Sequence, residues 1–104
     1  MSGPDLSVGP AVVAETVRLA ALEVPGVLRV GRSGDWLRQR LAGSPVAVRL
    51  QGSEVSVQVA IVARPGQSLQ VLTNHVRVAV VAALERQLGL RPGAVTVSVD
   101  GVGA

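Results

Sequence analysis

Apolar residues recur at helical spacing in the first part of this 104-residue chain. Residues 11–24 place a set of small aliphatic side chains on one face of a helix, and Pro10 suits the first turn. The residues on that face are Val13, Val17, Ala20, Ala21 and Val24. Pro25 and Gly26 end the segment, because proline disfavours the helical conformation of the preceding residue. The pattern predicts a first helix with one buried stripe.

A second helical pattern covers residues 68–88, with Ser68 as the N-terminal cap and Gly89 in the left-handed position after the last turn. We expect Leu90 to fold back on that turn. The predicted buried side consists of Leu69, Leu72, Val76, Val80, Ala83, Leu84 and Leu88. Val71, Val78 and Val81 fall off this side, so the helix needs a second apolar contact. Either a second copy of the chain provides it, or the helix lies between a sheet and the first helix.

Strict alternation of apolar and polar residues predicts strands elsewhere. Residues 46–51 and 55–63 form a hairpin around Gly52 and Ser53, and residues 95–99 form a last strand. Residues 27–30 are expected to be extended, residues 6–8 a short strand and residues 35–42 a short helix. The order is (β)α(α)ββαβ. It predicts a two-layer α+β sandwich in which two main helices cover the apolar face of a small sheet and the other face is polar.

Composition narrows the possible functions. Hydrophobic residues make up 48% of the chain and aromatic residues 1%, so the core is built from Val, Leu and Ala. The absence of cysteine excludes disulfides, thiolate zinc sites and cysteine nucleophiles. We expect one domain over residues 1–104, with an ordered core of about 6–102. No apolar run approaches the roughly 20 residues of a membrane span, and no signal peptide is recognisable, so a cytoplasmic protein is expected.

Candidate chemistry is sparse. His75 is the single histidine, and the seven carboxylates are scattered along the chain. No P-loop or dinucleotide-binding glycine pattern occurs. We therefore expect no enzyme activity, no metal site and no cofactor. The net charge of +3, with ten arginines, is a mild excess that argues against a dedicated nucleic-acid domain.

One segment has the outline of a functional motif. Gly31, Arg32, Ser33 and Gly34 form the G-x-x-G with which KH modules clamp a nucleic-acid backbone. Such a clamp lies between two helices, however, whereas residues 27–30 should be extended here. Alternatively, the segment covers the end of the core. In a third interpretation it is a contact patch for a protein partner or an anionic membrane surface. The patch residues are Arg29, Arg32, Trp36, Arg38 and Arg40.

Three stretches together resemble the alkaline-shock, or envelope-stress-response, protein family of bacteria. They are AALEVPGV at residues 20–27, VSVQVAIVARPGQSL at 55–69, and VRVAVVAALERQLGL at 76–90 followed by VTVSVDGV at 95–102. The resemblance implies a small cytoplasmic non-enzyme that self-associates, accumulates under envelope or alkaline stress in some members, and is held at the membrane by a separate anchoring protein. It brings no catalytic residues. The chain lacks the long charged tails of some members, and the G-x-x-G falls in a variable region.

The resulting hypothesis is a non-enzymatic, envelope-stress-associated scaffold or adaptor. Its expected partners are a second copy of itself and a membrane-anchored protein, which would hold it at the inner face of the cell membrane. The alternative hypothesis is a KH-like module that binds single-stranded nucleic acid through residues 31–34.

Overall fold

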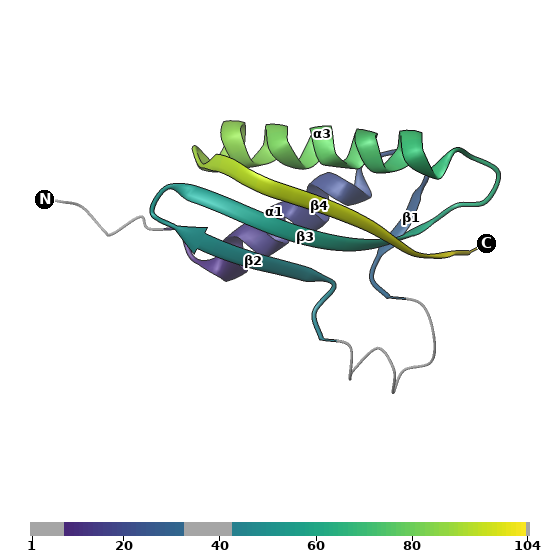
Figure 1. Cartoon of the computed structure of the whole chain (residues 1–104), viewed down its shortest axis with the longest axis horizontal. Helices are drawn as coiled ribbons and strands as arrows, with labels where there is room; N and C mark the ends of the chain where they lie inside the picture. The colour runs from purple at the N-terminus through teal and green to yellow at the C-terminus, as the bar shows by residue number, and fades with distance from the viewer. Residues whose placement is uncertain (1–7, 33–42, 104) are drawn as a thin grey trace, which may run out of the picture.

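The computed structural model of the protein describes residues 8–32 and 43–103 (Figure 1). The elements are α1 (Pro10–Leu22), β1 (Val27–Val30), β2 (Val46–Gln51), β3 (Glu54–Ala63), α3 (Leu69–Leu88) and β4 (Arg91–Val102). The strands form one sheet, and α1 packs over β1 and β2 while α3 packs over β4. The predicted two-layer α+β sandwich is confirmed. The expected strand at residues 6–8 and helix at 35–42 lie outside the described residues, except for Val8, which is in no strand.

β3 is the central strand. Along one edge it pairs in parallel with β4, and along the other it pairs antiparallel with β2 and then with β1. The change of partner occurs at Ala60, whose N–H donates to the Pro45 carbonyl (2.8 Å) and whose carbonyl accepts from the Gly31 N–H (2.9 Å). Residues 27–30, expected only to be extended, are therefore a strand, because the last part of β3 supplies their pairing partner.

The local predictions for α3 are confirmed. The Ser68 hydroxyl accepts a hydrogen bond from the Val71 N–H (3.3 Å), Gly89 has a φ of 65°, and the Leu90 N–H donates to the Leu84 carbonyl (3.0 Å). These contacts satisfy backbone groups that the helix ends leave unpaired. The last strand is longer than predicted, since its pairing with β3 runs from Arg91 to Val102 and register shifts accommodate the extra residues.

The core lies between the helices and the inner face of the sheet. All five residues predicted for the buried side of the first helix are buried, although α1 ends at Leu22 and Val24 therefore lies after it. The alternate residues of β3 are buried too. These are Val55, Val57, Val59, Ile61 and Ala63. The prediction that Leu69 is buried is wrong, because its side chain is 39% exposed. Leu69 is the first residue of α3 and follows the largely exposed residues 64–68, at the end of the helix layer.

The outer face of the sheet is polar, as predicted, where Arg49, Gln58 and Thr96 are exposed. It becomes apolar near the end of β3, where Val62 is buried. A Cβ on Gly103 would lie 3.4 Å from a Val62 methyl carbon and 3.0 Å from a Leu28 methyl carbon. Gly103, which follows β4, therefore packs on this small apolar area.

Candidate functional site

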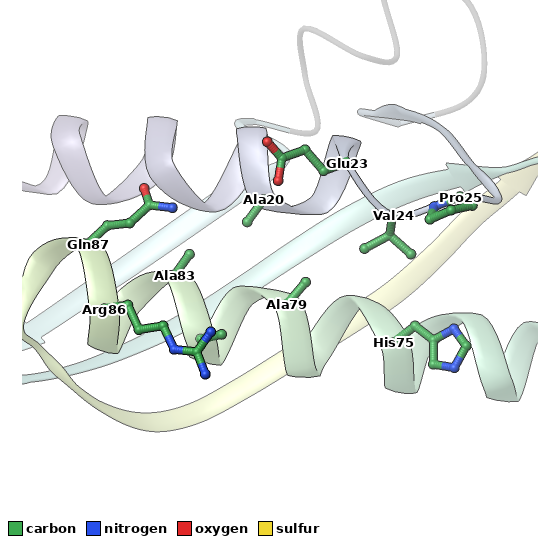
Figure 2. Close-up of a pocket in the computed structure, with 10 residues that line it drawn as sticks. Ala20, Glu23, Val24, Pro25, His75, Ala79, Ala83, Arg86 and Gln87 are labelled. Carbon is green, nitrogen blue, oxygen red and sulfur yellow. The ribbon is translucent and has the colours of Figure 1, made fainter.

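A groove of about 480 Å³ lies between α1 and α3 on the side of the helices that faces away from the sheet (Figure 2). Its floor is made of small side chains from both helices: Ala20, Ala79 and Ala83, with Val24 at one end. Ala20, Val24 and Ala83 are buried, and Ala79 is half-buried. The groove is therefore an apolar surface in direct continuity with the core.

Large apolar side chains are also exposed on the two helices that form this groove. Val12 and Leu19 of α1 are 52% and 48% exposed, and Val71 and Val78 of α3 are 53% and 61% exposed. Within each pair the residues are seven positions apart, which places them on the same side of their helix. We call the groove and these four side chains the helix-layer surface.

α3 packs against both the sheet and α1, but these contacts do not cover Val71 and Val78. Both side chains are more than half exposed. Val81, the third residue off the core side, is half-buried. The outer side of α3 is thus available for contact with another molecule.

Charged and polar side chains lie at the rim of the groove. Glu23 follows the last turn of α1, and His75, Arg86 and Gln87 come from α3 (Figure 2). All four are exposed. This arrangement surrounds an apolar floor with groups that water or a partner can solvate, as is typical of contact surfaces.

An ion pair on α1 lies outside the groove lining. Arg18 donates from Nε to Glu15 Oε1 (3.0 Å) and from Nη2 to Oε2 (2.6 Å). These hydrogen bonds, with the attraction between the two opposite charges, lower the pKa of the Glu15 carboxyl and raise the pKa of Arg18. Both groups are solvated, so the pair contributes little to stability.

Across residues 8–32 and 43–103, no three side chains of His, Cys, Asp or Glu come together in a way that could hold a metal ion. His75 is exposed on α3.

Only part of the arginine and tryptophan patch predicted from sequence falls within the described residues. Arg29 is exposed on β1, and Arg32, just after it, forms an ion pair with Asp100 at 3.9 Å between Nη1 and Oδ1. Trp36, Arg38 and Arg40 lie outside the described residues. The structure therefore connects Arg32 to the end of β4 and leaves the contact patch a prediction.

The G-x-x-G motif is also partly described. Gly31 follows β1 directly, and its N–H is hydrogen-bonded to Ala60 of the central strand. Its first residue thus continues a sheet edge, whereas a KH clamp joins two helices. Ser33 and Gly34 lie outside the described residues, and binding of nucleic acid by residues 31–34 stays a prediction.

The groove was not predicted from sequence. The sequence signal for it is a set of small residues on two helices that were both expected to pack on one face of the sheet. These residues are Ala20 of the first helix and Ala79, Ala82 and Ala83 of the second. Alanine stripes are also common where helices simply pack closely. The sequence therefore contained the residues of the groove without indicating that they face each other.

Comparison with solved structures shows where the same fold occurs. Two variants of the MamM CTD superpose with a TM-score of 0.57 at 21% identity, covering 88% of this chain and 95% and 94% of those chains. A zinc form of another MamM CTD variant has a TM-score of 0.59 at 20% identity, covering 90% of this chain and 87% of that chain. At this identity the likeness establishes the fold alone. No curated protein matches the chain in sequence.

In the part of the chain that the structure describes, neither helix has the length and apolar character that crossing a membrane requires. Residues 3–104 match the sequence profile of the alkaline shock protein 23 family. This family is described as having a cell envelope-related function. That description names no catalysed reaction. The match spans both helices and all four strands. The chain belongs to the alkaline shock protein 23 family, whose function is related to the cell envelope.

Proposed function

We propose that this protein is a non-enzymatic scaffold or adaptor of the cell envelope that self-associates and binds a membrane-anchored protein. The observation that carries the proposal is the helix-layer surface, where an apolar groove lies between two helices that also expose four large aliphatic side chains. In this role the protein lies in the cytoplasm, at the inner face of the membrane, through its partner. Envelope stress is the condition under which we expect it to act.

The shape of the surface favours a helical partner segment. The alanines of the floor leave room for aliphatic side chains of a partner between α1 and α3. The exposed Val12, Leu19, Val71 and Val78 add apolar area on the same two helices. An amphipathic helix that lies in such a groove buries one apolar face and leaves its polar face in water. Glu23 and Arg86 at the rim can pair with charges of either sign on that helix.

The absence of enzyme activity is part of the proposal. The groove rim carries His75 and Glu23, and the described floor consists of aliphatic groups, so a molecule seated on that floor meets apolar contacts. The shallow polar hollow on the outer sheet face is lined by Arg49, Ser56, Gln58 and Thr96, among others, and has no carboxylate in its lining. Both features favour binding over catalysis.

The test is a pull-down from membrane and soluble fractions with three forms of the protein. The double variant Leu19→Glu with Val78→Glu places charges on the helix-layer surface, and the control Ala47→Glu places one on an exposed position of β2. All substituted positions are exposed, so circular dichroism should show the same fold. We expect the wild type and the control to recover a membrane protein that the double variant loses.

Two results would contradict the proposal. One is equal recovery of the membrane protein by the double variant and the control. The other is recovery of single-stranded RNA at about 150 mM salt that disappears when Arg32 and Ser33 are replaced by Asp, because released counterions drive phosphate binding and added carboxylates oppose it. That second result would support the KH-like alternative.

A further inference from the structure

We propose that the free edge of β4 is the surface through which two copies of this chain associate, by antiparallel strand pairing centred on Val97. The inference rests on the self-association in the proposed function and specifies its contact. It adds a second surface, on the sheet, to the helix-layer surface that we assign to the partner protein.

The free edge of β4 has unpaired backbone groups. Within residues 8–32 and 43–103, β4 pairs with β3 alone. The Ala94 N–H points toward β3, where it donates to the Ser56 hydroxyl (3.2 Å), and the Val95 carbonyl accepts from Arg77 Nε of α3 (3.2 Å). Because successive residues of a strand direct their backbone groups to opposite sides, Val95, Val97 and Val99 direct theirs away from β3.

This edge has few of the features that usually prevent pairing. Natural edge strands are protected by charged side chains, prolines or short length. Residues 95–99 read Val-Thr-Val-Ser-Val, without charge or proline, and they lie within a strand of 12 residues. Arg77 protects this edge at one point, through its hydrogen bond to the Val95 carbonyl.

The sequence of the edge is self-complementary. A two-fold axis through Val97 places Val95 opposite Val99 and Thr96 opposite Ser98 of the second copy. Valines then meet valines on the face that carries the helices, and hydroxyls meet hydroxyls on the outer face, a pairing that stabilises antiparallel strands. The three outward residues of each copy would exchange about six backbone hydrogen bonds.

This symmetry favours a second copy over an unrelated extended peptide, because a peptide requires no palindromic pattern in β4. The charge distribution places no obstacle at the contact itself. Two copies that each carry a net charge of +3 repel each other, and the uncharged segment 95–99 lets them meet without placing like charges at the centre of the contact. Arg77 competes with the association, since its guanidinium occupies the acceptor that the Val99 N–H of the second copy would use.

The test measures self-association by sedimentation equilibrium over a range of concentrations. Thr96 and Ser98 are exposed on the outer face, so substitutions there leave the core unchanged. Replacing both by Lys places like charges opposite each other in the proposed register, and we expect association to weaken by about tenfold. The matched variant Thr96→Glu with Ser98→Lys places opposite charges there, and we expect it to associate at least as tightly as the wild type.

Two further measurements address the same contact. Arg77→Ala should tighten association, because it frees the Val95 carbonyl. Hydrogen exchange at the Val97 and Val99 amides should slow as the protein concentration rises, since these N–H groups become donors across the contact. Unchanged exchange at both amides over the concentration range in which copies associate would overturn the proposal.

The outcomes separate this inference from the proposed function. If the wild type associates but both charge variants associate equally well, the β4 contact is refuted and self-association stands. If association is instead lost in the Leu19→Glu, Val78→Glu variant, the helix-layer surface is the contact between copies. If the wild type stays monomeric at all concentrations, the β4 contact and the self-association are both refuted, and the pull-down alone decides the adaptor role.

Discussion

Replacing Gly26 by Ala tests the contact that joins the α1–β1 turn to the β3–α3 turn. The Gly26 carbonyl accepts hydrogen bonds from the Arg64 N–H (2.8 Å) and from Gln67 Nε2 (2.8 Å), and the same Gln67 amide donates to the Arg64 carbonyl (2.8 Å). Gly26 has a φ of 101°, which side chains other than glycine rarely adopt. A Cβ at this position would overlap Gln67 Oε1.

The expected cost has two parts. A left-handed backbone conformation costs an alanine about 1–2 kcal/mol. Displacement of Gln67 removes two hydrogen bonds, each worth about 1 kcal/mol. We therefore expect Gly26→Ala to lower the free energy of unfolding by about 3–4 kcal/mol, a large part of the 5–15 kcal/mol typical of a domain.

Gly66 offers a matched control. Its φ is 83°, and a Cβ there would meet nothing within 4 Å, so Gly66→Ala should cost only the backbone part, about 1–2 kcal/mol. Urea denaturation of the two variants and the wild type gives both values. In the background of Gln67→Ala the overlap is absent, and there Gly26→Ala should cost about as much as Gly66→Ala. Equal costs of Gly26→Ala with and without Gln67 would refute the reasoning.

Two other predictions concern the helices. Val80→Asp should prevent folding as judged by circular dichroism, because Val80 is fully buried and an unpaired carboxylate there costs several kcal/mol. The control Val78→Asp should fold, because Val78 is 61% exposed. A folded Val80→Asp variant would mean that the core side of α3 is assigned wrongly. The pKa of the Glu15 carboxyl is lowered by its hydrogen bonds from Arg18, so its contribution to stability is present above the pKa of unfolded Glu and is lost as the pH falls through the lower folded value. Since the group is exposed, thermal melts of Glu15→Gln and wild type between pH 7 and pH 3 should nearly coincide, and a clearly steeper acid loss in the wild type would contradict this.

Features that depend on a few neighbouring residues were predictable from the sequence. Ser68 before an apolar periodic segment and Gly89 after it determined both ends of α3, because capping involves groups within one turn. The alternation in residues 46–63 determined the hairpin and the inner face of β3, since a strand places every second side chain on the same side. The stripe of α1 followed from its helical period in the same way.

Features that depend on contacts between distant segments required the tertiary structure. Residues 27–30 are a strand only because β2 leaves the last part of β3 free to pair with them, and residues 91–94 join β4 because β3 extends that far. Likewise, only the packing of both helices over the sheet showed that Val71 and Val78 face outward, that alanines of α1 and α3 form a groove, and that β4 lies at an edge. Local patterns determine which face of each element is apolar, but the exposure of a surface depends on which other elements cover it, and that is decided by the whole chain.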